Sequence, residues 1–205
     1  KYLFIYLIVG IKLYFLYMIR KGKKIKFKNY FITGTIILLI LLPHIIWLIE
    51  NEYVTIFYGL QRAGGVGSLL DHLVHPLTFL IKQIIILLPF FFMFFFLIKK
   101  IKLRFSFNDK KLIFLIFTTI VPILLILITS MLMGAKIRTM WMTPFYLFSG
   151  VFLIYIFKKD ILKNNLNKFN FIFLFFFLIS PILYLVISLS NDSKRTDYPG
   201  KEIAR

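Results

Sequence analysis

The short segment Gly134–Met140 carries two cations, Lys136 and Arg138, and is followed by an aromatic residue, Trp141. An ammonium group and a guanidinium group at this spacing could hold a phosphate, the first as a point charge and the second as a bidentate fork. The same residues could instead anchor the chain at lipid headgroups, with Trp141 at the membrane interface. The local pattern favours neither interpretation, so both stay open.

A second segment with candidate chemistry, Glu50–Pro76, mixes carboxylates with aromatic residues and contains one arginine, Arg62. We expect a re-entrant or interfacial helix here, with aromatic side chains such as Tyr58 at headgroup depth and Arg62 available to a phosphate. Glu50 could orient an acceptor or pair with Arg62. The spacing alone favours an aromatic belt with a solvated arginine.

The end of this segment holds two further patterns. Its glycine-rich stretch, residues 64–68, lacks the ending of a phosphate-binding P-loop, and we interpret it as a flexible hinge. Asp71, His72 and His75 offer oxygen and nitrogen ligands, but a tetrahedral metal site needs three or four converging ligands, and a polar turn ahead of Pro76 explains these residues as well. The sequence thus predicts no metal site and identifies no cofactor, and it leaves a divalent metal open.

These candidates lie between long apolar runs, which must position them. The chain has 205 residues, of which 60% are hydrophobic, and that share is typical of an integral membrane protein. The runs lack the apolar and polar alternation of barrel strands, so they predict helices. We expect an all-α, polytopic transmembrane helix bundle with six spans, at about residues 2–19, 30–49, 77–98, 112–133, 141–157 and 169–190. Residues 1–190 would form this membrane domain, and 191–205 an outward tail that could open a soluble domain.

The charge pattern orients these spans. The connections 20–28, 99–111 and 158–168 hold six, six and four basic residues, which by the positive-inside rule are cytoplasmic. The alternate connections hold six of the eight carboxylates and face outward. We therefore expect a multi-pass protein of a bacterial inner membrane. Its net charge of +18 flanks the spans, which indicates anionic lipid headgroups rather than nucleic acid as partners.

Polar residues within the spans are few. Lys12 and Lys82 can snorkel to the headgroups, and His44 is expected to form a hydrogen bond between helices. No carboxylate lies in the middle of a span, and neither internal repeats nor broken helices are evident. These features disfavour an ion-coupled transporter or a solute permease.

Several stretches resemble the membrane half of bacterial GT-C glycosyltransferases, specifically the polyprenyl-phosphate-sugar enzymes such as the aminoarabinose transferases of lipid A and the protein O-mannosyltransferase-like proteins. The stretches are Pro43-His44-Ile45-Ile46-Trp47 with Asn51, Tyr53, Thr55, Tyr58 and Arg62, then His75-Pro76 and residues 83–89, then 134–141 with Pro144, Tyr146 and Gly150, and finally 194–201. Together they cover most of the chain from Pro43 onward.

The resemblance implies an enzyme that transfers a sugar from a polyprenyl phosphate to a lipid, glycan or protein acceptor at the periplasmic face. It implies that cations hold the donor phosphate, and the candidates are Arg62, Lys136, Arg138 and Lys82. The secondary site candidates are Glu50, Asn51, Tyr58 and Trp141. The acid that such enzymes carry on their first outward loop is expected upstream of these residues, so the catalytic residues are unknown. The alternative is a non-catalytic protein that binds the same lipid carrier, such as a flippase or a component of a polysaccharide polymerase.

Overall fold

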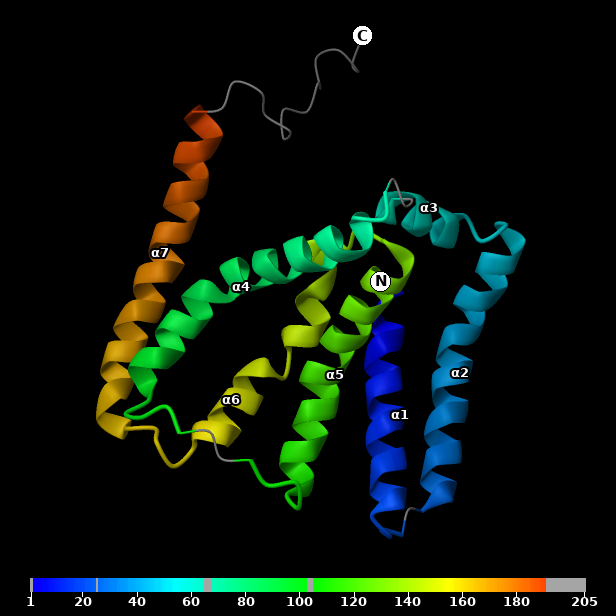
Figure 1. The fold of residues 1–205 in the computed structure, drawn as a ribbon, viewed down its shortest axis with the longest axis horizontal. Helices are drawn as coiled ribbons and strands as arrows, with labels where there is room; N and C mark the ends of the chain where they lie inside the picture. Colours follow the sequence, from blue (N-terminus) through cyan, green and yellow to red (C-terminus); the bar gives the residue numbers. More distant parts are fainter. Residues whose placement is uncertain (1, 25, 65–67, 103–104, 191–205) are drawn as a thin grey trace. The chain divides into compact units, whose positions relative to one another are not determined.

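The structure is a computed structural model that describes residues 2–24, 26–64, 68–102 and 105–190. Within these ranges the chain is helical, which confirms the all-α class, and its only extended pairing is an isolated bridge between Ile98 and Ile161 (Figure 1). The helices are α1 (Phe4–Arg20), α2 (Phe27–Glu50), α3 (Val54–Ala63), α4 (Asp71–Leu97), α5 (Lys110–Met133), the 3₁₀ helix η1 (Thr139–Tyr146), α6 (Ser149–Phe157), the 3₁₀ helix η2 (Lys163–Asn165) and α7 (Leu166–Ser190).

Four of the predicted spans are helices that are long and apolar enough to cross a membrane, namely α2, α4, α5 and the run Lys163–Ser190 that contains α7. The predicted first span corresponds to α1, which has 17 residues. At about 1.5 Å per residue this helix is about 26 Å long, which is short of the roughly 30 Å of a hydrocarbon core. The described residues thus support four or five spans, and the predicted six are not confirmed.

The predicted span at residues 141–157 is not one continuous helix. It is divided between η1 and α6, which meet at a bend of 51°. Pro144 removes a backbone donor inside η1, and Gly150 lowers the helix propensity at the start of α6. The expectation that the chain has no broken helix is therefore wrong, because this bent pair forms either a broken span or a re-entrant loop.

The helix α4 begins six residues before the predicted boundary at Leu77, so the expected polar turn ahead of Pro76 is instead helix. The reason is a capping box. The backbone N–H of Ser68 donates to Asp71 Oδ2 at 2.8 Å, and the Ser68 hydroxyl accepts from the N–H of Leu70 at 3.0 Å. These bonds satisfy polar groups at the helix start and favour a helix that begins before the apolar run.

The region predicted as one membrane domain divides into two compact units. Unit 1 comprises residues 1–86 and 102–158, and unit 2 comprises residues 87–101 and 159 onward, so that α4 contributes to both. The predicted outward tail, residues 191–205, lies outside the described residues, as do residues 65–67 of the predicted glycine hinge.

The core of unit 1 joins four elements. It contains Leu7 of α1, Phe79 of α4, Ile126 of α5, and Met142 and Phe145 of η1. All five side chains are at least nine-tenths buried. The core therefore fixes η1 against the three longer helices.

The helices α1 and α5 pack closely at Gly10. A Cβ at this position would overlap the carbonyl oxygen of Phe117 and lie 3.3 Å from Pro122 Cγ. Elsewhere along the same pair, the hydroxyl of Tyr6 donates to Thr129 Oγ1 at 2.9 Å. The missing side chain at Gly10 thus allows the backbones to approach and the polar pair to form.

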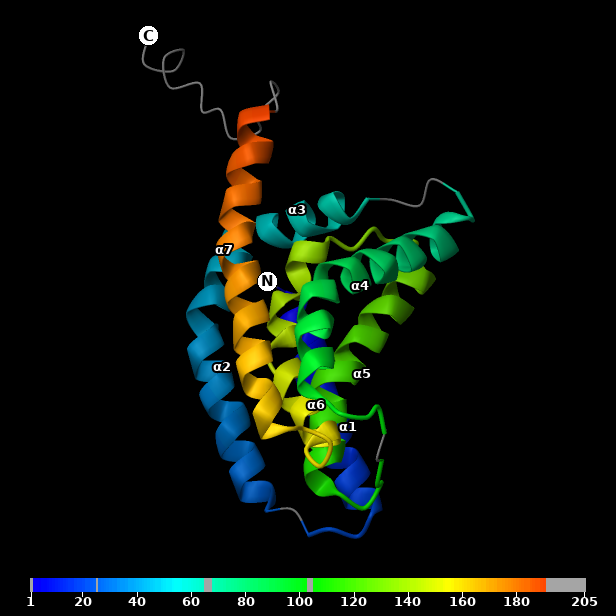
Figure 2. The same ribbon diagram turned by 90° about the vertical axis from the view of Figure 1, so that its left-hand side faces the viewer.

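The carboxyl end of α1 and the amino ends of α2 and α5 lie at one end of unit 1 (Figure 1 and Figure 2). The Tyr17 hydroxyl at the end of α1 donates to the carbonyl of Phe107, and the Tyr155 hydroxyl of α6 donates to Asp109 Oδ2 at 2.6 Å. Asp109 also caps α5, because its Oδ1 accepts from the N–H groups of Lys111 and Leu112. The Tyr155 bond, more than the capping bonds, holds the pKa of Asp109 below its usual range.

At the opposite end of unit 1, Tyr2 links the start of the chain to α2 and α3. Its hydroxyl oxygen lies 3.2 Å from His44 Nε2 and 2.5 Å from Thr55 Oγ1. The hydrogen bond predicted for His44 is therefore confirmed. Glu52 and Tyr53, between α2 and α3, both have positive φ, at 51° and 57°, and this pair of left-handed residues makes the sharp corner from which α3 departs.

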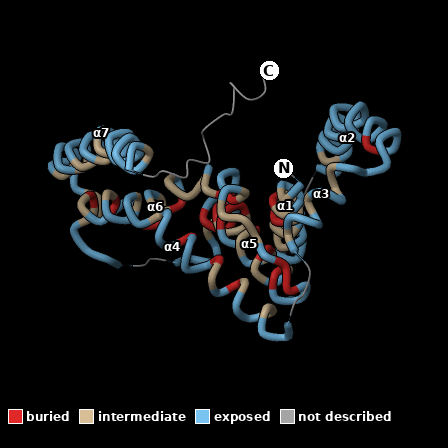
Figure 3. Tube along the Cα trace, turned by 90° about the horizontal axis from the view of Figure 1, so that it is seen from above, coloured by how far each residue is buried: buried red, intermediate tan, exposed pale blue. Residues whose placement is uncertain are grey.

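Two long helices bury almost nothing within the described chain (Figure 3). Of the apolar window in α2 only 6% is buried, and of that in Lys163–Ser190 none is. A helix that is apolar all round and unburied in water would be unstable, but it is ordinary in lipid, which solvates its side chains. This exposure agrees with a chain that lies in a membrane.

We predict opposite effects for two glycines that both lie in helices. Gly10→Ala should lower the free energy of unfolding by about 1–3 kcal/mol, because the methyl group forces α1 and α5 apart. Gly34→Ala, the matched control, meets nothing within 4 Å and should be neutral or stabilising by up to about 1 kcal/mol. Unfolding of both variants by denaturant in detergent measures the difference. Equal effects of the two substitutions would refute close packing at Gly10.

We predict that Tyr155→Phe makes stability less dependent on acid pH. A carboxylate with a lowered pKa stabilises the folded state above its unfolded pKa of about 4, and this contribution disappears as the pH falls through the folded pKa. Removal of the Tyr155 hydroxyl raises the pKa of Asp109 and reduces that contribution. The difference in Tm between wild type and variant should be largest near neutral pH and shrink below about pH 4.

The control for this experiment is Tyr17→Phe. The Tyr17 hydroxyl donates to a backbone carbonyl, which does not titrate. The Tm difference for that variant should not change with pH, and a parallel pH dependence in both variants would contradict the assignment to Asp109.

Candidate functional site

The two segments with candidate cations meet at a backbone hydrogen bond. The N–H of Lys136 donates to the carbonyl oxygen of Ala63 at 2.8 Å. Ala63 is the last residue of α3, whose final carbonyl groups have no partner within the helix. The helix ends there because Gly64 has a φ of +73°, which turns the chain away. The bond therefore places Arg62, the neighbour of Ala63, close along the backbone to Lys136.

Arg138 follows two residues later and is the N-cap of η1. Its backbone carbonyl accepts from the N–H of Trp141 at 3.1 Å, which fixes the start of the 3₁₀ helix. The side chain is partly buried, and its Nε is buried without a hydrogen-bond partner in the described part of the chain. A buried donor without an acceptor is costly, and the cost is greater for a charged group. An anion at this position would remove that cost.

Arg62 and Lys136 are exposed to solvent, in contrast to Arg138. The Arg62 guanidinium lies 5.1 Å from the centre of the Tyr58 ring, one turn earlier on α3. This cation–π contact restrains the side chain and leaves its N–H groups free to donate. We refer to Arg62, Lys136 and Arg138 together as the cation cluster.

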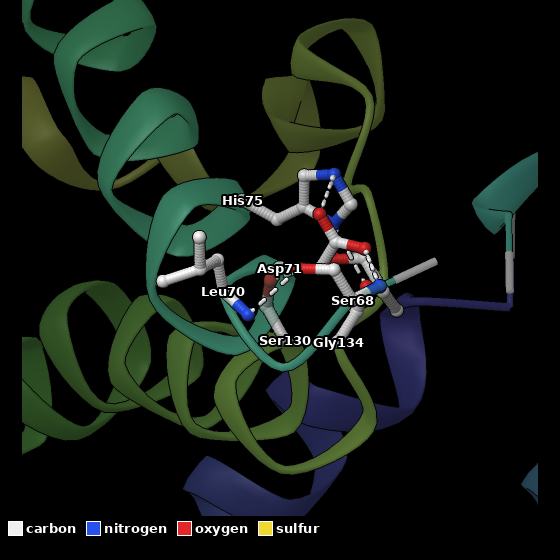
Figure 4. A network of polar contacts seen from close by, with 7 residues as sticks. Ser68, Leu70, Asp71, His75, Ser130 and Gly134 are labelled. Atoms are coloured by element: carbon white, nitrogen blue, oxygen red, sulfur yellow. Dashed lines mark hydrogen bonds and ion pairs between the residues drawn. The ribbon is translucent and has the colours of Figure 1, made fainter. Parts of the chain in front are cut away.

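The start of α4 is tied to the same region by histidines (Figure 4). His75 Nδ1 donates to the carbonyl of Gly134 at 2.8 Å, while its Nε2 lies 3.6 Å from Asp71 Oδ1. His72 Nδ1 donates to the carbonyl of Met131 at 2.6 Å. Since carbonyl oxygens only accept, Nδ1 carries the hydrogen in both rings. The histidines therefore hold α4 against the carboxyl end of α5, just before the segment that carries Lys136 and Arg138.

The histidine contacts also bear on metal binding. Across the ranges that the structure describes, no group of three or more His, Asp or Glu side chains converges as a metal site would require. Asp71, His72 and His75 act instead in the capping box and in the attachment of α4 to α5.

Among the described residues, Lys82, Glu50 and Asn51 form no hydrogen bond or ion pair with the cation cluster. Lys82 is exposed on α4, about three turns beyond Asp71. Because α4 begins at Asp71 and not at Leu77, Lys82 lies further from the start of its helix than the snorkelling expectation assumed. Glu50 is exposed at the end of α2 and is not paired with Arg62, contrary to one expectation. Asn51 caps α2, because its Nδ2 donates to the Trp47 carbonyl at 2.8 Å.

A buried polar pair in the core, Gln83 and Tyr146, was not indicated by the sequence pattern. Gln83 is 4% exposed, the Tyr146 hydroxyl donates to its Oε1, and its Nε2 is buried without a hydrogen-bond partner among the described residues. A lone glutamine inside an apolar run is a signal that could have found it. Its partner lies 63 positions later, on η1, and only the fold brings them together.

Three comparisons give no relative. No protein-family model, no curated protein and no solved structure matches this chain. What the chain does must therefore be argued from its sequence pattern and from the geometry of the cation cluster.

We predict that Gln83 and Tyr146 are strongly coupled. Tyr146→Phe leaves both polar atoms of the buried amide without a partner and should destabilise the fold by about 1–3 kcal/mol. Gln83→Leu removes the amide, so the double variant with Tyr146→Phe should be less destabilised than the sum of the two single variants. Unfolding of the four proteins in detergent gives the coupling energy. Additive effects would mean that the hydrogen bond contributes nothing.

Proposed function

We propose that this chain is the membrane part of a GT-C-type glycosyltransferase that moves a sugar from a polyprenyl-phosphate carrier to a lipid, glycan or protein acceptor. The cation cluster would hold the donor phosphate at the outer, periplasmic face of a bacterial inner membrane. The observation that carries this proposal is Arg138, whose Nε is buried without an acceptor among the described residues, two positions after the exposed Lys136.

The geometry suits a phosphate at a membrane surface. Arg62 and Lys136 are fixed near each other by the 2.8 Å bond between the backbones of Ala63 and Lys136. Arg138 can form two parallel hydrogen bonds to phosphate oxygens, whereas Lys136 supplies a point charge. The aromatic rings of Tyr58 and Trp141 suit the interfacial depth at which a lipid phosphate lies.

The reaction explains why cations would be needed. The acceptor hydroxyl oxygen forms a bond to the anomeric carbon, the bond from that carbon to the phosphate oxygen breaks, and the bonding electrons leave with the polyprenyl phosphate. Negative charge thus grows on the phosphate, and a positioned guanidinium stabilises the transition state more than the ground state. The acceptor proton passes to a base, and no described residue is assigned that role.

The same cluster would serve a protein that binds the lipid carrier without bond cleavage, such as a flippase or a polymerase component. Binding of the carrier is common to both candidates, whereas sugar transfer belongs to the enzyme alone. Measuring both carrier binding and sugar transfer therefore separates the two candidate functions.

We predict that Arg138→Ala weakens binding of polyprenyl phosphate by about ten-fold or more, because it removes charge-assisted hydrogen bonds at a desolvated position. Arg138→Lys should retain part of the affinity, since it keeps the charge and loses the fork. Titration of the purified chain in detergent with polyprenyl phosphate measures the dissociation constant. In the full-length protein, transfer of a radiolabelled sugar from polyprenyl-phosphate-sugar should fall in the same order.

The control is Arg20→Ala, which removes an exposed arginine at the end of α1, among the residues predicted to be cytoplasmic. It should leave binding and transfer unchanged. Unchanged binding in Arg138→Ala would remove Arg138 from the site. Normal carrier binding by the full-length wild type without sugar transfer would favour the carrier-binding alternative.

A further inference from the structure

Unit 2 contains a feature that the cation cluster does not involve. Its two segments are joined by an antiparallel bridge between Ile98 and Ile161. The N–H of Lys99 donates to the carbonyl of Asp160 at 2.9 Å, and the N–H of Leu162 donates to the carbonyl of Leu97 at 3.3 Å. These bonds hold the end of α4 beside the connection that leads into α7.

An open groove of about 370 Å³ lies next to this bridge. One wall is Phe96 of α4, and the other consists of Asn167, Lys168, Phe171 and Ile172 in the first turns of α7. The α7 residues are spaced three and four apart, so they share one helix face. The surface of the groove is therefore almost wholly apolar, and Asn167 and Lys168 line it at the start of α7.

The charge around the groove is one-sided. Within residues 87–101 and 159–190 there are five lysines, all exposed, and one carboxylate, Asp160. The lysines are Lys99, Lys100, Lys159, Lys163 and Lys168. Four of them lie within two residues of Ile98 or Ile161 in the bridge, and Lys168 lines the groove itself. Lys168 also lies in the first turn of α7, where the helix dipole disfavours a cation unless an anion is near.

We propose that this groove binds an anionic membrane phospholipid. The headgroup phosphate lies against Lys168 and Asn167, and the upper part of an acyl chain lies between Phe96 and Phe171. Charge complementarity selects an anionic headgroup over a zwitterionic one, because the surrounding lysines attract net negative charge. The phenyl walls select a lipid over a free anion, since inorganic phosphate would leave them uncovered.

This site is independent of the proposed function. It uses no residue of the cation cluster, belongs to a different compact unit, and takes a membrane lipid that is not consumed. Loss of sugar transfer in cation-cluster variants would leave it unaffected.

The test is native mass spectrometry of the whole chain purified in detergent, with added phosphatidylglycerol or phosphatidylcholine. Phosphatidylglycerol should bind in preference. Lys168→Gln should weaken its binding about five-fold, as expected for one lysine near an anionic lipid. Lys168→Arg should restore the affinity. Phe171→Ala should also weaken binding by opening one wall of the groove.

Matched controls come from the same chain. Lys28→Gln removes an exposed lysine of α2 in unit 1. Phe173→Ala removes an exposed α7 phenylalanine that stacks on Phe177 at 6.0 Å and does not line the groove. Both should bind phosphatidylglycerol as the wild type does. Equal binding of the two lipids, equal effects of Lys168→Gln and Lys28→Gln, or displacement of the lipid by inorganic phosphate would each overturn the proposal.

Discussion

The close packing of α1 on α5 is the contact on which unit 1 depends. Lipid provides no hydrophobic force between helices, so they associate where small residues allow the backbones to approach, and Gly10 provides that approach. Polar attachments to α5 then gather at its ends, because polar side chains are costly in the hydrocarbon and are tolerated near the headgroups. His72 and His75 attach α4 at the carboxyl end, and Asp109 accepts from Tyr155 at the amino end.

The cation cluster is a consequence of this arrangement. The segment after α5 is held on one side by His75, which binds the Gly134 carbonyl, and on the other by the end of α3, which accepts from Lys136. A chain fixed at both points has little freedom to turn the next residues toward water. Arg138 consequently begins η1 with part of its guanidinium removed from solvent. Its desolvation is a property of the fold, since the surrounding sequence is that of an ordinary interfacial turn.

Hydropathy predicted the long helices because membrane-spanning length and apolar composition are both recorded in the sequence. It missed the start of α4, since a capping box at Ser68 and Asp71 extends the helix into polar residues that a hydropathy criterion rejects. It also missed the break between η1 and α6, because the apolar run continues across it while Pro144 interrupts only the backbone bonds.

For the candidate site too, the sequence indicated which residues to consider, whereas their contacts came only from the fold. The sequence offered Arg62, Lys136 and Arg138 as candidates, because they are basic residues in connections predicted to face outward. The contact between the end of α3, which carries Arg62, and the segment that carries Lys136 could not be predicted. It depends on a backbone hydrogen bond from Lys136 to Ala63, which almost any pair of residue types could form. The buried state of Arg138 Nε is likewise seen only in the structure.

The two groups of cations would attract anions by different physical routes. The lysines of unit 2 are exposed, so their attraction acts at a distance, adds up over several charges and is screened by salt. Arg138 would act at contact through a desolvated N–H, where a bound phosphate would replace missing hydrogen bonds and screening would be weaker. Exposed charges therefore suit a lipid that is abundant and exchanges readily. A desolvated guanidinium suits a rarer phosphate that must be held in one orientation while a bond to it breaks.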